Sequence, residues 1–289
     1  MASCRNLLAV GGTEEVIKLY DLKTKKSAGE LAGVHDSAVT CLAISRNCKY
    51  VFSGAEDGLV VIWRATDQEP LHQLRVKNVS KVVSVSMHNS GRMLLALYAN
   101  GMVRLWSMLD ARCIFKKKAG IVEDSQSEDE EAEEEVEEEK AEQEQDYMAE
   151  YLKKNRRAEL IKWEPSSGLV YAVLFDRLLE IYTVESDGPL HQVNFDSVQT
   201  GFDFLSPTEL VVCDDLGRLT YLKDVDKEGG ISMRIVETTY KRFRMVTTSP
   251  DCEFFTALTN ESISLWNVWS FRDELARKEE GDLMCELQP

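Results

Sequence analysis

SGAEDGLVVIW, the stretch from Ser53 to Trp63, decides the fold. It joins a small polar residue, a turn built on Glu56-Asp57-Gly58 and an apolar run that ends in Trp. Similar runs end in an aromatic residue at five other places, and a short polar or acidic residue stands six positions before each aromatic. The pairs are Glu14 and Tyr20, Asp57 and Trp63, Asn100 and Trp106, Asp176 and Tyr182, Asp215 and Tyr221, and Asn260 and Trp266. This paired signal, found six times, indicates an internal repeat.

The aromatics are separated by 43, 43, 76, 39 and 45 residues. A period of about 40 residues made of short strands is typical of propeller blades rather than of helical repeats. The second copy illustrates the pattern, with β-rich runs at 38–45, 50–56, 59–63 and 70–76. These runs are apolar on both sides, which suits sheets covered on both faces. The sequence therefore predicts an all-β propeller with six readable blades.

We expect four strands in every blade except the first, for which only three are visible. The last strand of the sixth blade is expected at 282–287, DLMCEL, after a short helix at 269–281 anchored by Trp269 and Leu275. The total of roughly twenty-three strands is one short of six complete blades. Two ways of closing the ring remain possible. The propeller has six blades, or it has seven, of which the seventh is missing or supplied by a partner.

The long step of 76 residues contains an insertion. We expect a single propeller domain in three parts: blades one to three at 1–119, an acidic low-complexity insertion at 120–156, and blades four to six at 157–289. The insertion has no Gly or Pro after its first residue and is rich in Glu, so helix propensity competes with self-repulsion. We expect disorder through the Glu run and a helix from about 142 to 157.

The charge of the chain is concentrated in this insertion. The formal net charge is −16, and residues 123–146 hold fifteen acids and one Lys, so the rest of the chain carries only −2. The propeller body is therefore not an obvious phosphate-binding surface. The acidic residues offered as a partner-binding segment are Glu128, Asp129, Glu130, Glu131, Glu133, Glu134, Glu135, Glu137, Glu138 and Glu139.

Three interpretations of the acidic segment stay open. It shields a basic partner protein, it is a solvated spacer, or it is regulated by phosphorylation at Ser125 and Ser127. Two basic runs, 116–118 and 153–157, flank the insertion. They either pair with the neighbouring Glu run or contact the phosphates of a nucleic acid.

Other features exclude several classes of function. The seven cysteines form no CxxC pair and accompany no His cluster at zinc-ligand spacing, so we expect reduced thiols and no metal site. Gly11-Gly12 lacks the Lys-Ser/Thr of a phosphate loop, so we expect no cofactor and no small-molecule substrate. We also expect no signal peptide and no membrane span, because the first residues have no charged leader and no apolar stretch is long enough.

One set of residues resembles a catalytic triad. His35, Ser53 and Asp57 occur in the second blade together with Trp63. We favour a structural network, in which Asp orients His, His bonds Ser and Ser reaches the indole N–H of Trp, because buried polar groups need partners. No GxSxG elbow accompanies Ser53, so we expect no enzyme activity.

These motifs carry a family resemblance. Gly33-Val34-His35 followed by SGAEDGLVVIW resembles the WD-repeat pattern of glycine-histidine, turn aspartate and terminal tryptophan. VHDSAVTCLAIS, FSGAEDGLVVIW and MHNSGRMLLALYANGMVRLWSM resemble more narrowly the PAK-interacting protein family, the animal relatives of the fungal Mak-eleven ribosome-assembly factor. DLMCEL is similar to that family's strand after the sixth blade. The resemblance is strongest over 33–110.

The resemblance implies a seven-bladed protein of the nucleolus and nucleus that acts in assembly of the large ribosomal subunit and rRNA processing. Its partners would be ribosome-assembly proteins and pre-large-subunit particles, with only indirect rRNA contact. The alternative that it implies is an adaptor that binds and inhibits a p21-activated kinase. The chain departs from the family pattern: Arg64 replaces an Asp after Trp63, only one blade has the full polar network, and the family's N-terminal extension, final strands and Lys-rich tail are not seen.

Overall fold

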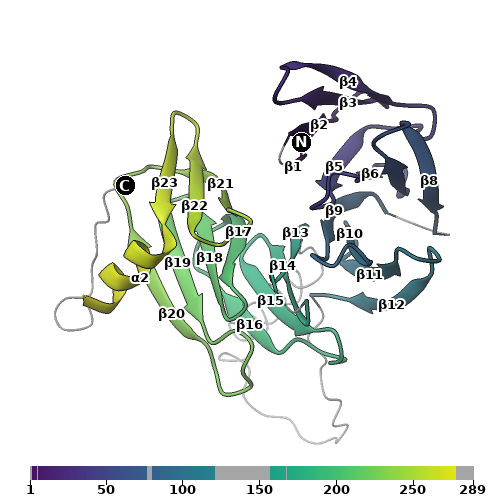
Figure 1. Ribbon diagram of the computed structural model, residues 1–289. Helices are drawn as coiled ribbons and strands as arrows, with labels where there is room; N and C mark the ends of the chain where they lie inside the picture. The colour runs from purple at the N-terminus through teal and green to yellow at the C-terminus, as the bar shows by residue number, and fades with distance from the viewer. Residues whose placement is uncertain (1, 5, 77–79, 121–156, 167, 278–289) are drawn as a thin grey trace, which may run out of the picture.

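The computed structural model describes residues 2–4, 6–76, 80–120, 157–166 and 168–277. These residues form six antiparallel sheets and a helix, and the predicted all-β propeller architecture is confirmed. Figure 1 shows the sheets side by side along an arc, each with its first strand toward the inside. The first strands of successive sheets contact one another, β1 with β5, β5 with β9, and so on to β21.

The strands of each sheet follow one another in chain order. The first sheet contains β1 (Ala2–Cys4), β2 (Leu7–Val10), β3 (Ile17–Asp21) and β4 (Lys26–Leu31). The second contains β5 (Val39–Ile44), β6 (Tyr50–Ala55), β7 (Val60–Arg64) and β8 (Glu69–Leu74). The third contains β9 (Val82–Met87), β10 (Met93–Tyr98), β11 (Met102–Ser107) and β12 (Cys113–Lys118).

The second half repeats this arrangement. The fourth sheet contains β13 (Ala158–Trp163), β14 (Val170–Phe175), β15 (Leu178–Thr183) and β16 (His191–Asn194). The fifth contains β17 (Gln199–Ser206), β18 (Glu209–Asp214), β19 (Arg218–Lys223) and β20 (Ser232–Glu237). The sixth contains β21 (Phe243–Thr248), β22 (Phe254–Thr259) and β23 (Ile263–Asn267), and it is followed by helix α2 (Val268–Arg277).

The core is divided among the interfaces between sheets. Five clusters of buried apolar side chains join the described sheets in consecutive pairs, from the first and second to the fifth and sixth. Trp63, for example, packs with Ile17 and Leu19 of the first sheet. Each inner sheet is thus buried on both faces, which explains why its strands are apolar on both sides. Among the described residues no cluster joins the sixth sheet to the first, and Figure 1 shows these two sheets apart.

The outward face of the sixth sheet is therefore apolar and exposed. Ile263 and Leu265 are 72% and 60% exposed. Both lie in β23 ahead of Trp266, as Val60 and Ile62 lie in β7 ahead of Trp63, yet Val60 and Ile62 are fully buried beneath the third sheet. These repeat positions are buried in the second sheet, because the third sheet covers them. The equivalent positions of the sixth sheet are exposed, because no described sheet covers that face.

The prediction of three strands for the first sheet was wrong. Residues 2–4 form β1, which pairs antiparallel with β2 through Ala2 opposite Ala9. β1 is only three residues long and has no apolar alternation, so nothing in its sequence marks it as a strand. The strand expected at 282–287 lies outside the described residues, as does the helix expected from about 142 to 157 except for its last residue.

The predicted C-terminal helix is present, but one of its two expected anchors is not buried. α2 packs on the fifth and sixth sheets through Val268, Phe271 and Leu275, which lie three and four residues apart on one helix face. Trp269 is 71% exposed because it lies one position off that face. The helix is also tied to the fifth sheet, since Nη1 of Arg234 donates to the carbonyl oxygen of Leu275 at 2.6 Å.

Candidate functional site

The second sheet brings the four residues of the predicted polar network together. Nε2 of His35 lies 2.7 Å from Oγ of Ser53, and the indole Nε1–H of Trp63 donates to the same oxygen at 2.8 Å. Oδ2 of Asp57 lies 3.5 Å from Nδ1 of His35, which is longer than a good hydrogen bond. The other carboxylate oxygen of Asp57 accepts from the N–H of Leu59 at 2.8 Å and closes the turn.

Asp57, His35 and Ser53 follow one another as in a hydrolytic triad, but their burial and hydrogen bonds indicate a structural role. Ser53 is fully buried in the middle of β6, so no substrate reaches its oxygen. That oxygen already accepts the indole N–H of Trp63, while its own hydrogen is directed to Nε2 of His35 when Nδ1 carries the ring proton beside Asp57. The arrangement therefore gives the buried Ser53 hydroxyl and the indole N–H of Trp63 their partners and offers no free nucleophile.

Burial also controls the charge of His35. Desolvation lowers the pKa of His35 below its ordinary value of 6.5, and Asp57 opposes this shift. The imidazole is consequently neutral in the folded protein at pH 7. Because the unfolded chain takes up this proton below about pH 6.5 and the folded chain resists it, the stability that His35 contributes is present above that pH and declines below it.

The closing aromatics of other sheets meet different partners. The hydroxyl of Tyr182 donates to Oε2 of Glu180 at 2.5 Å, and Nε1 of Trp266 donates to Oγ of Ser264 at 3.1 Å. Nε1 of Trp106 is buried and has no hydrogen-bond partner among the described residues. In the third sheet, Ala96 occupies the position that Ser53 occupies in the second, ten residues before the tryptophan. The repeat thus keeps its aromatic while the polar partner changes.

In the fifth sheet the repeat is shifted by one residue from the predicted pair of Asp215 and Tyr221. Asp214, not Asp215, closes the turn, because its Oδ1 accepts from the N–H groups of Leu216 and Arg218 at 3.0 and 2.7 Å. Thr220 is therefore the counterpart of Trp63, and the side chain of Tyr221 points to the opposite face, toward the sixth sheet. There its hydroxyl donates to Oε1 of Glu209 at 2.5 Å.

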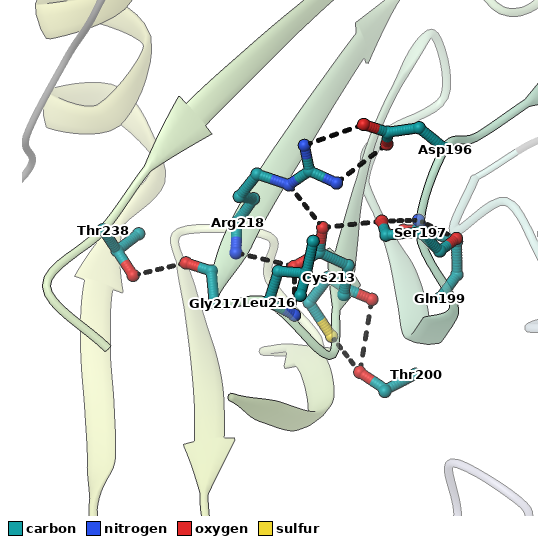
Figure 2. A network of polar contacts seen from close by, with 10 residues as sticks. Asp196, Ser197, Gln199, Thr200, Cys213, Leu216, Gly217, Arg218 and Thr238 are labelled. Atoms are coloured by element: carbon teal, nitrogen blue, oxygen red, sulfur yellow. Dashed lines mark hydrogen bonds and ion pairs between the residues drawn. The ribbon is translucent and has the colours of Figure 1, made fainter. Parts of the chain in front are cut away.

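Arg218 completes this second polar network (Figure 2). Its guanidinium bonds both carboxylate oxygens of Asp196, at 2.8 and 3.1 Å, and its Nε donates to Oδ2 of Asp214 at 2.7 Å. Ser197 donates to the same Asp214 oxygen at 2.8 Å. The hydrogen bond from Arg218 lowers the pKa of Asp196 below its usual range. The network ties the connection between the fourth and fifth sheets to the turn at Asp214.

The acidic segment itself lies outside the described residues, but the structure describes the residue from which it departs. The N–H of Gly120 donates to Oε2 of Glu180 at 2.7 Å, and Glu180 is fully buried in β15. Gln192 donates to the other oxygen of this carboxylate at 3.0 Å. Ala119 and Ala158, on the two sides of the insertion, belong to one core cluster. Sequence reasoning missed Glu180, since a single Glu in an apolar strand has no distinctive pattern.

The basic run at 116–118 is divided between two faces of β12. Lys117 is half-buried, and its Nζ donates to the carbonyl oxygens of Val184 and Ser186 in the loop between β15 and β16. Burial lowers the pKa of Lys117 from its ordinary value, with Asp187 opposing the shift. Lys116 and Lys118 are exposed on the other face. Only these two of the three lysines are positioned to meet an external anion.

The described residues hold no group of three or more His, Cys, Asp and Glu side chains that could bind a metal ion. In the same part of the chain, no helix combines the length and the apolar character that crossing a membrane requires.

Comparisons with known proteins agree with this architecture. The family model described as "WD domain, G-beta repeat" matches residues 30–64, which include all four residues of the polar network. A chain in the crystal structure of the mitotic checkpoint complex superimposes with a TM-score of 0.69 over 91% of this chain and 71% of its own length. Its sequence is only 15% identical, so it shows the fold alone. The chain is a β-propeller that carries a WD repeat at residues 30–64.

Within that class, the family resemblance found in the sequence is confirmed. The p21-activated protein kinase-interacting protein 1-like protein of Danio rerio is 24% identical over 268 residues, which cover 93% of this chain and 62% of that protein. Protein MAK11 of Saccharomyces cerevisiae is 27% identical over 112 residues, 34% of this chain and 27% of its own. The chain thus resembles the PAK-interacting and MAK11 proteins, and it spans less than two thirds of the length of either relative.

Substitution of Asp57 tests the network. Asp57→Ala is expected to lower the free energy of unfolding by about 1 to 3 kcal/mol, because Leu59 and His35 lose their partner. The difference in the free energy of unfolding between parent and variant should grow as the pH falls from 7.5 to about 5.5, since losing the carboxylate lowers the pKa of His35 further. Urea denaturation at both pH values measures this. Asp67→Ala, which removes an exposed pair with Arg64, is the control and should change stability by less than about 1 kcal/mol. Equal stability of the Asp57 variant and the parent would contradict the network.

In the third sheet a hydrogen-bond partner can be added instead of removed. Ala96→Ser places a hydroxyl where Ser53 lies in the second sheet and should give Nε1 of Trp106 an acceptor. The expected gain in the free energy of unfolding is about 0.5 to 1.5 kcal/mol, the usual net contribution of one hydrogen bond. The same substitution combined with Trp106→Phe should give no gain relative to Trp106→Phe alone. A gain of equal size in both backgrounds would show that the indole does not use the new hydroxyl.

Proposed function

We propose that this chain is a non-catalytic scaffold in biogenesis of the large ribosomal subunit, located in the nucleolus and nucleus. The observation that carries the non-catalytic part is the burial of Ser53, whose oxygen is bound to Trp63 and His35. The triad-like set therefore serves the fold, and function is assigned to surfaces and loops. The ribosomal part is supported by the similarity to MAK11 and by the family resemblance of residues 33–110.

The mechanism that we propose is simultaneous docking of several proteins. Stacked sheets hold the connecting loops at fixed positions, so different loops can bind different partners without a chemical step. Polar networks reinforce this, as where Arg218 ties Asp196 to the turn at Asp214. The acidic segment, with its carboxylates from Glu128 to Glu139, is proposed to bind a basic ribosomal protein before assembly. The hydrogen bond between Gly120 and Glu180 supports a fixed point of departure for it.

A second candidate is an adaptor that binds a p21-activated kinase. It is favoured by the name of the Danio rerio relative, a p21-activated protein kinase-interacting protein 1-like protein that is similar over 93% of this chain. The two candidates differ in location and in the proteins that would be bound. Both candidate functions are compatible with a propeller scaffold, so they are distinguished by identifying the proteins that the chain binds.

Affinity purification of the tagged chain followed by mass spectrometry tests the proposal. The intact chain should be found in the nucleolus and should recover pre-large-subunit proteins. Deletion of residues 123–146 should leave the propeller folded, with an unchanged melting temperature, and should reduce recovery of a basic ribosomal protein. The control for length replaces the ten acidic residues from Glu128 to Glu139 with Gln, which keeps the spacer and removes the charge.

The outcomes distinguish the alternatives. If the Gln variant binds as well as the parent while the deletion does not, the segment is a spacer. If both variants bind as well as the parent, the segment has no part in capture of the basic protein. A chain that is excluded from the nucleolus, lacks pre-ribosomal proteins and recovers a kinase would contradict the ribosomal role and establish the second candidate.

A further inference from the structure

Three cationic side chains lie together on one face of the third sheet. Arg104 of β11 is directly opposite Lys116 of β12, and Lys118 is opposite Met102 in the same ladder. Side chains directly opposite one another have Cβ atoms about 5 Å apart, and the diagonal neighbour is about 7 to 8 Å away. Like charges at these separations repel one another and destabilise the strand pair. The sheet therefore keeps a concentration of positive charge that does not help it to fold.

This charge is not neutralised within the described residues. Arg104, Lys116 and Lys118 form none of the ion pairs found there. Arg104 instead lies with its guanidinium carbon 5.9 Å from the centre of the Tyr98 ring, and Tyr98 is almost completely buried. An aromatic face attracts a cation without cancelling its charge. The cation is thus held in place and stays available to an anion.

β12 is fixed to the rest of the propeller by its other face. Lys117 donates to carbonyl oxygens of the loop between β15 and β16, and its Nζ lies 4.8 Å from the centre of the Phe115 ring. Phe115 packs against the cluster between the third and fourth sheets. The alternate residues Ile114, Lys116 and Lys118 are all exposed, and Ile114 is 53% exposed. β12 thus presents one apolar and two cationic side chains from a rigid support.

β12 also has a free edge within the described residues. It is the outermost strand of its sheet and pairs with β11 alone. Its unpaired N–H and C=O groups can receive an added strand. Two other outer strands lack this combination of edge and charge: the exposed positions of β8 include Glu69, Leu71 and Gln73, and those of β20 include Met233, Ile235 and Glu237.

We propose that β12 is the docking edge for an extended acidic peptide of a partner protein. The peptide adds a fifth strand to the third sheet through main-chain hydrogen bonds. Carboxylates at alternate positions lie opposite Lys116 and Lys118, and an apolar side chain two residues further along lies opposite Ile114. Alternation places all three on the same side of the added strand. The partner is thus recognised by an acidic-x-acidic-x-apolar pattern or its reverse.

The observations favour a peptide over a nucleic acid. Only three cations are gathered here, and the chain outside residues 123–146 has a net charge of −2, so the surface lacks the broad positive field that attracts phosphate backbones. The free edge of β12 supplies donors and acceptors at strand spacing, which a peptide backbone matches. This inference concerns a binding surface and does not depend on the ribosomal role.

Fluorescence anisotropy with a defined probe tests this docking edge. The probe is a labelled peptide in which Glu alternates with Val, added to the full chain at low ionic strength. Lys116→Glu combined with Lys118→Glu should weaken binding by at least about tenfold, which corresponds to about 1.4 kcal/mol. Lys23→Glu combined with Lys26→Glu, which makes the same change in net charge at exposed positions near β4, should change it by less than about twofold. Hydrogen exchange of residues 113–118 should slow when the peptide binds.

Three results would overturn the proposal. Equal affinity of the charge-reversed variant and the parent, with both folded by circular dichroism, would show that the lysines only protect the strand edge from aggregation. Equal weakening by the control reversal would show that only net charge matters. A single-stranded RNA oligonucleotide that binds more tightly than the peptide, depends on the same lysines and leaves the exchange of residues 113–118 unchanged would establish a nucleic-acid site. The milder pair Lys116→Gln and Lys118→Gln should give an intermediate loss.

Discussion

The stacking of each sheet on the next through apolar side chains is the interaction on which the structure depends. A sheet such as the fourth has a middle strand, β14, that is buried at every position, and it contributes to the clusters on both of its faces. No single sheet has a core of its own. Stability must therefore come from nearest neighbours, as in other repeat proteins, and it should be greatest for sheets that have two neighbours.

This constraint explains why the repeat is so uneven in sequence. Stacking requires apolar side chains at given positions, but the hydrogen-bond partners of the closing aromatic residues can differ from sheet to sheet. The second sheet connects its tryptophan to Ser53 and His35, the fourth joins Tyr182 to the buried Glu180, and the sixth uses Ser264 two residues before Trp266. In each of these sheets a nearby side chain accepts the hydrogen bond of the buried aromatic residue. The WD signature is consequently clear in one blade and weak in the others, although all of them share the architecture.

Sequence reasoning succeeded where the chain repeats itself and failed where one residue decides the outcome. The period of the aromatics located the strands that carry Trp63 and Trp106. It misplaced Tyr221, because a shift of one residue reverses the face of a strand and both faces of this sheet are apolar. It chose Trp269 as a helix anchor, whereas helical spacing from Leu275 selects Phe271.

Other features have no sequence signal at all. β1 is too short to show a pattern, and its pairing with β2 becomes visible only when the first sheet is assembled. The hydrogen bond from Gly120 to Glu180 joins residues sixty positions apart, and the cationic face of Arg104, Lys116 and Lys118 depends on the register of β11 and β12. Long-range register of this kind comes from tertiary packing rather than from local propensity. The functional surfaces proposed here rest on such contacts.

Hydrogen exchange measured strand by strand tests most directly whether stability comes from stacking of neighbouring sheets. If it does, amide exchange is slowest in the middle strands β10, β14 and β18, whose sheets are covered on both faces. Exchange should be faster in β23, which alternates exposed and buried residues and has an uncovered outer face. Exchange in β23 as slow as in β14 would contradict the dependence on stacking, because a sheet with one described neighbour would then be as stable as a sheet with two.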